Sequence, residues 1–251
     1  MNPKPLRKYK RERPREHRAV TIGLGFTCND GVVLCADRQI TDNVGLKYEK
    51  TKVSLHQVAS ALHRGEKVLV AFGITYAGDP DKAKVLADSL SLKITEQIFR
   101  WPHDESAKRI IESCLRSSNA RPESVLIAFQ TKASSAWRKP FLIRTSGTKV
   151  VHGFREYIGV GDSSVIRYLD TLVGSKIREI AQAERIGAYM VSVANTCVDR
   201  CSGGPDILTL RDREGPAGIK KGVSVGNIED ELSRVIFVTL QKEKAPTGIG
   251  A

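Results

Sequence analysis

The order of predicted strands and helices in this 251-residue chain indicates an α+β fold, arranged as a four-layer αββα sandwich. Apolar runs typical of strands form two blocks. Each block is followed by a pair of helices whose apolar residues recur at three- and four-residue spacing. Strands and helices that are segregated in this way favour sheets covered by helices rather than a series of βαβ units. A short strand closes the order, and the chain shows no internal repeat.

The first strand block opens with a predicted β-hairpin over residues 21–37. Asn29, Asp30 and Gly31 join its two apolar runs, and these residue types tolerate the positive φ angles of tight turns. The second run, residues 32–36, is continuous and rich in β-branched side chains, which is typical of a strand buried on both faces. The sequence then predicts a turn and a strand edge within residues 39–53, followed by strands at residues 53–55 and 67–73.

Capping signals place the first helix pair. Asp79 is a natural N-cap, and Pro80 suits the first helical position, where its missing N–H is not needed. Pro102 ends this helix and Asp104 begins the second. The next strands are predicted at residues 124–129, 140–144, 149–153 and 157–160. The second pair comprises a helix with apolar residues from Val165 to Ile180 and a helix over about residues 183–199, before a strand at 207–210 and a helical segment at 227–236.

The charge of the chain is concentrated at its start. The first 18 residues hold eight lysines and arginines and two glutamates, which is +6 of the formal net charge of +12. This segment has too few apolar residues to offset the entropy of ordering, so we expect residues 1–20 to be a disordered tail or a propeptide. We expect residues 21–240 to form a single domain and residues 241–251 a flexible C-terminal tail.

The composition argues against a membrane span, a secreted protein and a metal site. No apolar run reaches the roughly 18–20 residues that a span requires, and no apolar segment of the secretory kind follows the basic start, so we expect a cytoplasmic protein. Five scattered cysteines indicate reduced thiols. Cys197 and Cys201 lie four residues apart, but no second Cys/His pair stands nearby, and buried thiols are the preferred interpretation. We predict neither a metal nor a cofactor.

Three motifs combine residues that could carry chemistry. A hydroxyl opens the hairpin at Thr21, a carboxylate closes it at Asp37 sixteen residues later, and Lys52 follows in a lysine-rich stretch. The second motif is Tyr76-Ala77-Gly78, which leads into the first helix. The third is residues 199–204, an acid and two spacers before Ser202-Gly203-Gly204, between a helix and a strand.

Together these motifs resemble the proteasome β-subunits and their bacterial relatives, within the N-terminal nucleophile (Ntn) hydrolases, over roughly residues 19–236. The resemblance implies a threonine-type peptidase that becomes active after loss of residues 1–20, without metal or cofactor. It implies a peptide or unfolded-protein substrate and assembly into a homo- or hetero-oligomeric ring. It assigns catalytic roles to Thr21, Asp37, Lys52, Asp199 and Ser202, an oxyanion N–H to Gly78 and a place in the substrate pocket to Tyr76.

The residue types fit this chemistry. A threonine hydroxyl is a weak nucleophile unless a base takes its proton, and the α-amine of an N-terminal threonine, with a pKa of about 8, is close enough to do so. A lysine beside the hydroxyl lowers the hydroxyl's pKa, and a carboxylate holds that lysine in place. A backbone N–H then stabilises the tetrahedral oxyanion.

The chain departs from the family pattern at three positions. Val20 stands where active members usually have glycine, Val160 replaces a serine between two glycines, and Ile22 follows the nucleophile where a hydroxyl is common. These departures motivate a second hypothesis, a non-catalytic ring or scaffold subunit of the same fold. A third hypothesis is nucleic-acid binding by residues 1–18, which no base-reading or stacking motif supports.

Overall fold

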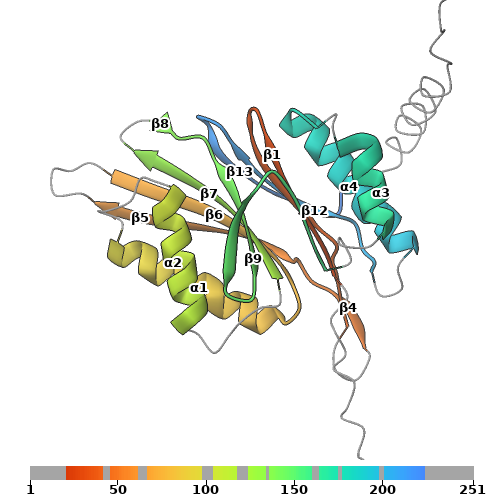
Figure 1. Cartoon of the computed structure of the whole chain (residues 1–251), viewed down its shortest axis with the longest axis horizontal. Helices are drawn as coiled ribbons and strands as arrows, with labels where there is room; N and C mark the ends of the chain where they lie inside the picture. The colour runs from red at the N-terminus through yellow and green to blue at the C-terminus, as the bar shows by residue number, and fades with distance from the viewer. Residues whose placement is uncertain are drawn as a thin grey trace, which may run out of the picture.

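The computed structural model describes residues 21–41, 46–61, 67–97, 104–117, 124–133, 136–159, 164–174, 177–197 and 201–223. Within these residues two antiparallel sheets form the centre of the molecule (Figure 1). The first sheet has the order β11-β1-β2-β12-β13. Its strands are β1 (Ile22–Cys28), β2 (Gly31–Ala36), β11 (Arg155–Gly159), β12 (Asp206–Arg211) and β13 (Gly215–Lys220).

The second sheet has the order β10-β9-β7-β6-β5, with β8 beside β7. Its strands are β5 (Val53–Ala61), β6 (Lys67–Ala77), β7 (Ser124–Ala133), β8 (Ala136–Trp137), β9 (Phe141–Ser146) and β10 (Lys149–Gly153). A short ribbon of β3 (Gln39–Thr41) and β4 (Lys47–Glu49) connects the two sheets in sequence, and Gln39 pairs with Glu49 within it.

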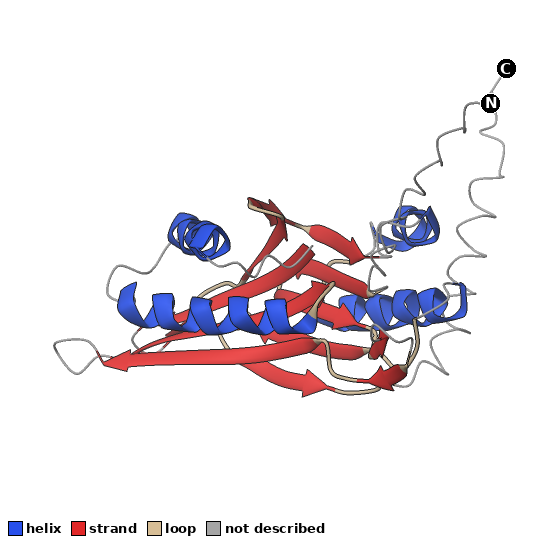
Figure 2. Ribbon diagram, turned by 90° about the horizontal axis from the view of Figure 1, so that it is seen from below, coloured by secondary structure: helices blue, strands red, loops and turns tan. Residues whose placement is uncertain are grey.

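Helices cover the outer face of each sheet. The helices α1 (Pro80–Gln97) and α2 (Asp104–Ser117) pack on the second sheet, and α3 (Ser164–Val173) and α4 (Ile180–Cys197) pack on the first. In both overall views the helices form two groups separated by strands (Figures 1 and 2). None of the helices in the described ranges combines the length and apolar character that a membrane crossing needs.

Three separate apolar cores confirm the predicted αββα sandwich. One core lies between the second sheet and its helices, another between the first sheet and its helices, and the third contains residues of both sheets. Alternation along β6 illustrates the arrangement, because Phe72 and Ile74 face the helices while Gly73 faces the other sheet. A Cβ on Gly73 would lie 2.0 Å from a methyl carbon of Leu208, so the glycine lets the two sheets approach closely.

The predicted third helix is wrong in its extent, because α3 ends at Val173 and Ile180 begins the next helix. Gly174 follows α3, and glycine favours the end of a helix. The backbone N–H of Ile180 donates to Oδ1 of Asp30 at 2.8 Å, so a residue of the β1–β2 turn caps the start of α4. The spacing of apolar residues along α3 and α4 does not predict this cap, because Asp30 is distant in the sequence.

The strand β13 was not predicted, because its sequence GPAGIK has a weak apolar pattern and contains proline and glycine. It pairs only with β12 at the edge of the first sheet, where a proline is tolerated. The predicted helical segment at 227–236 and both predicted tails lie outside the described residues.

Candidate active site

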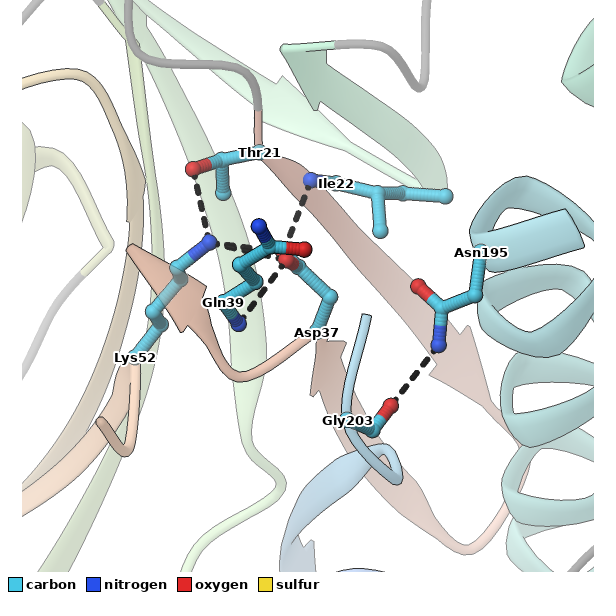
Figure 3. A network of polar contacts seen from close by, with 7 residues as sticks. All are labelled: Thr21, Ile22, Asp37, Gln39, Lys52, Asn195 and Gly203. Carbon is cyan, nitrogen blue, oxygen red and sulfur yellow. Dashed lines mark hydrogen bonds and ion pairs between the residues drawn. The ribbon is translucent and has the colours of Figure 1, made fainter. Parts of the chain in front are cut away.

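Thr21, Asp37 and Lys52 meet at one end of the two sheets (Figure 3). Thr21 directly precedes β1 and Asp37 directly follows β2, so the antiparallel pairing of these strands brings the two residues together. Lys52 precedes β5 in the other sheet. Its Nζ donates to Oγ1 of Thr21 at 2.9 Å and to the two carboxylate oxygens of Asp37 at 3.0 and 2.9 Å. The structure therefore brings together the first three residues predicted for the site.

The ion pair of this cluster is almost completely buried. The exposed fractions are 2% for Thr21, 0% for Asp37 and 1% for Lys52. A buried ion pair is tolerated only when hydrogen bonds satisfy its remaining groups. The Asp37 carboxylate accepts the backbone N–H of Ile22 at 3.0 Å and that of Gln39 at 3.2 Å, in addition to Lys52. These bonds fix the carboxylate, which in turn directs the lysine toward the threonine hydroxyl.

Burial shifts the pKa values of both charged groups in the direction that favours the neutral form of each. It lowers the pKa of Lys52 below its ordinary value of 10.5, while the nearby Asp37 charge opposes this shift. Burial likewise raises the pKa of Asp37, against the opposing effect of Lys52. A lysine with a lowered pKa loses its proton more easily, so Lys52 is better able to accept a proton from the adjacent hydroxyl.

The lowered pKa of Lys52 predicts a pH dependence of stability. Between the folded pKa and 10.5, the unfolded chain binds more protons at this lysine than the folded chain does. The contribution of Lys52 to the free energy of unfolding therefore rises with pH over that interval. Urea denaturation of the wild type and of Lys52→Met at a series of pH values measures this contribution as a difference. A difference that falls with rising pH would mean that folding raises the pKa of Lys52.

Gly159 lies directly against the backbone of Thr21. It pairs with Ile22 between β11 and β1 and has a φ of 67°, which favours glycine. A Cβ at this position would lie 1.9 Å from the carbonyl oxygen of Thr21. Only a residue without a side chain allows Thr21 to lie this close to β11, although the sequence alone assigned no role to Gly159.

Gly78 and Tyr76 lie on the segment predicted to line the site. Gly78 is buried directly after β6 and has a φ of 111°, a conformation that favours glycine. Tyr76 is 8% exposed and packs in the core between the second sheet and its helices. Burial raises the pKa of its hydroxyl to about 12. The Tyr76 ring faces away from the first sheet, whereas Ala77 faces toward Gly159.

The predicted serine–glycine motif lies beside Asp37, but its serine makes a backbone contact. The carbonyl oxygen of Ser202 accepts the backbone N–H of Arg38 at 3.2 Å, while the Ser202 side chain is exposed. Nδ2 of Asn195 on α4 donates to the carbonyl oxygen of Gly203 at 2.7 Å (Figure 3). These two bonds anchor the loop next to the site. Asp199, the acid of the same motif, lies outside the described residues.

Arg38 links several segments around the site, a role that the sequence does not predict. Its guanidinium group lies 3.1 Å from Glu49 of β4 and 3.6 Å from the buried Asp206 of β12. Its carbonyl oxygen accepts the backbone N–H of Lys50 at 2.8 Å. Arg38 therefore connects the strand end that carries Asp37 to the segment that carries Lys52.

The cysteines do not form a metal site within the described residues, where no group of three or more potential metal ligands occurs. Cys28, Cys35, Cys114 and Cys201 are buried free thiols, while Cys197 is exposed. The prediction of buried thiols at Cys197 and Cys201 is therefore confirmed for Cys201 and wrong for Cys197. Cys201 lies near the charged pair of the site. Burial, followed by the Asp37 charge, raises the pKa of its thiol to about 12, so it remains protonated at neutral pH.

Solved structures of Anbu proteins resemble this chain. An Anbu (Gly-1) mutant from Hyphomicrobium sp. strain MC1 has a TM-score of 0.68 and 14% identity, and the match covers 89% of this chain and 99% of the other. Anbu from the same strain gives 0.66 and 14%, over 88% and 97% of the two chains. Anbu (ancestral beta-subunit) from Yersinia bercovieri gives 0.64 and 11%, over 92% and 100%. No protein-family model and no curated protein matches the chain.

These matches correct the family assigned from the sequence. The assignment to the proteasome β-subunits and their bacterial relatives is wrong, because the matching structures reported above are Anbu proteins. The spacing of Thr21, Asp37 and Lys52 follows from strand ends that the fold brings together, so it does not distinguish between families that share the fold. At 11–14% identity the likeness concerns the fold alone. The chain has the α+β fold of these Anbu structures.

Proposed function

We propose that this protein is a threonine-type peptidase whose nucleophile is Thr21. The observation that carries the proposal is the 2.9 Å contact between Nζ of Lys52 and Oγ1 of Thr21, with Asp37 holding the lysine. A hydroxyl, an adjacent amine of lowered pKa and an orienting carboxylate form the arrangement that activates a nucleophile. The proteasome-related fold supports a hydrolase and is compatible with this assignment.

Maturation is part of the proposal, because Thr21 has no free α-amine while residues 1–20 remain attached. Cleavage of the Val20–Thr21 bond would release these residues and leave Thr21 as the first residue of the domain. Thr21 is only 2% exposed in the uncleaved chain, so access of a substrate requires the site to open. Removal of the tail would supply the free amine.

The reaction on a peptide substrate would then proceed in two stages. Oγ1 of Thr21 attacks the substrate carbonyl carbon and loses its proton to the amine of Lys52 or to the α-amine of Thr21. The π electrons of the carbonyl move to its oxygen, and the N–H of Gly78 stabilises this oxyanion. The C–N bond breaks as the leaving nitrogen takes the proton. Water then hydrolyses the resulting ester and regenerates Thr21.

Further roles are proposed for the surrounding residues and surfaces. Asp199 and Ser202 would orient the free α-amine of Thr21. The Tyr76 ring packs away from Thr21, so Tyr76 would line the substrate pocket through the backbone of the segment from Tyr76 to Gly78. The substrate would be a peptide or an unfolded protein. Val85 and Leu92 on α1 are 46% and 67% exposed, which fits contacts between subunits of a ring.

Thr21→Ala tests the proposed activity most simply. The wild type should hydrolyse members of a peptide panel, and Thr21→Ala should show no hydrolysis above the uncatalysed rate because it lacks the hydroxyl. Thr21→Ser keeps a hydroxyl and should retain measurable activity. Thr196→Ala, which changes an exposed threonine at the end of α4, is the matched control and should match the wild type. Equal hydrolysis by Thr21→Ala and the wild type would contradict the proposal.

A non-catalytic subunit is the second candidate, favoured by the burial of Thr21 and by the β-branched Val20 before it. Val20 would crowd the carbonyl that self-cleavage attacks. This candidate predicts a retained tail and no hydrolysis by the wild type, so the same peptide panel separates the two functions.

A further inference from the structure

Gln39 has a buried side-chain amide immediately beside the catalytic cluster. Its backbone is fixed there, because its N–H donates to Oδ2 of Asp37 at 3.2 Å and its Cα pairs with that of Glu49 in the β3–β4 ribbon. The residue is 3% exposed, and its Nε2 has no hydrogen-bond partner among the residues that the structure describes. The sequence showed no motif that distinguishes this glutamine.

An unpaired buried donor requires an explanation. Leaving one unsatisfied costs about 1–3 kcal/mol, and most buried polar atoms in proteins are paired. Figure 3 shows the amide end of Gln39 turned toward Thr21, between Nζ of Lys52 and the backbone nitrogen of Ile22. The side chain therefore presents its free N–H to the space around the proposed nucleophile.

The neighbouring groups leave Nε2 as the donor available to a ligand. Lys52 directs its bonds to Thr21 and Asp37, and the N–H of Ile22 is bonded to Asp37. A free N–H requires an acceptor, and the acceptor that arrives next to Oγ1 of Thr21 during acyl transfer is the carbonyl oxygen of the acyl group. Thr21 and Gln39 both lie against the Asp37–Lys52 pair, Thr21 through Nζ of Lys52 and Gln39 through its backbone N–H to Asp37, so an acyl group on Oγ1 of Thr21 lies near the Gln39 side chain.

We propose that Gln39 is an additional oxyanion donor of the peptidase reaction, together with the N–H of Gly78. This inference rests on the function proposed above. When Oγ1 of Thr21 bonds to the carbonyl carbon, the π electron pair moves to the carbonyl oxygen, and Nε2 of Gln39 donates a hydrogen bond to that oxygen. No proton is transferred from the amide, and the bond strengthens as negative charge develops on the oxygen.

A peptide boronate is the probe that tests this role. Its boron accepts Oγ1 of Thr21 and becomes tetrahedral, with a hydroxyl group in place of the oxyanion. The wild type, prepared from the full-length chain and matured so that it begins at Thr21, should form this adduct at Thr21, as located by mass spectrometry. Gln39→Met, which keeps the length of the side chain but has no N–H, should bind the boronate about 100-fold more weakly. In peptide hydrolysis the same variant should lower kcat and leave KM nearly unchanged.

Two controls separate catalysis from structure. Gln57→Met changes an exposed glutamine on β5 and should bind the boronate like the wild type. Gln39→Met removes an unpaired buried donor, so its melting temperature should equal or exceed that of the wild type. A purely structural role of Gln39 would lower the melting temperature and leave the boronate affinity of the folded fraction unchanged, which would overturn the inference.

The outcomes distinguish this inference from the proposed function. Equal boronate affinity of the wild type and Gln39→Met, with an adduct at Thr21 in both, overturns the role of Gln39 alone. Absence of a Thr21 adduct in the wild type overturns the proposed nucleophile, and the role of Gln39 with it.

Discussion

Lys52→Met is expected to slow the acylation of Thr21 by about 10²–10⁴-fold, the usual contribution of a general base. The variant removes the amine that lies 2.9 Å from Oγ1 of Thr21 and replaces it with a side chain that neither donates nor accepts a proton at that point. Lys149→Met, which changes an exposed lysine on β10, is the matched control and should react at the wild-type rate. The rate of boronate adduct formation at Thr21 measures this effect in both variants.

Lys52→Met should also destabilise the protein, because Asp37 would remain buried without its cation. Breaking a buried ion pair by removing one partner costs about 3–5 kcal/mol. The double variant Asp37→Asn/Lys52→Met removes both charges and should recover much of this stability, as measured by urea denaturation. It should not recover the reactivity of Thr21. A stable double variant that is acylated at the wild-type rate would show that Lys52 does not activate the hydroxyl.

Gly159→Ala is expected to combine a large loss of stability with a loss of Thr21 reactivity. Alanine at a φ of 67° is strained by about 1–2 kcal/mol. In addition, its Cβ would lie 1.9 Å from the carbonyl oxygen of Thr21, so β1 and β11 must separate next to Thr21. Displacement of the Thr21 backbone moves Oγ1 away from Lys52, and a shift of about 1 Å can lower a rate 100-fold.

Gly147→Ala isolates the effect of the contact from that of the backbone strain. Gly147 has a similar φ of 59°, but a Cβ there would have nothing within 4 Å. Its cost should therefore be the strain alone, whereas Gly159→Ala should lose about 1–3 kcal/mol more, the usual penalty of overpacking. Urea denaturation measures both variants. Equal losses of stability would show that Gly159 tolerates a side chain against Thr21.

The part of the site that the sequence predicts is the part set by local patterns. The turn residues 29–31 define the hairpin, and its pairing requires Thr21 and Asp37 to lie together at its open end. The position of Lys52 came from the motif resemblance, and the structure shows why the spacing works, since Lys52 directly precedes a strand of the facing sheet. The four-layer arrangement was likewise predictable, because it follows from segregated strand and helix periodicities.

The features that escaped prediction depend on contacts between distant segments. Asp30 caps the start of α4 although it lies 150 residues earlier in the chain, and the spacing of apolar residues around Ile180 does not predict this contact. Gly159 was noted only as one of the two glycines around Val160, and its contact with Thr21 became visible in the structure. The same holds for Gln39, whose significance lies in its burial and its unpaired Nε2 rather than in its residue type.

The N-terminal residue of the purified protein tests the central claim most directly. Full-length protein should be incubated under native conditions and examined by intact-mass measurement and N-terminal sequencing, with Thr21→Ala treated in parallel. The wild type should lose residues 1–20 and begin at Thr21, while Thr21→Ala should keep its tail because it lacks the hydroxyl that attacks the preceding carbonyl. A wild-type protein that retains residues 1–20 and hydrolyses no peptide of the panel would contradict the claim that Thr21 is an N-terminal nucleophile.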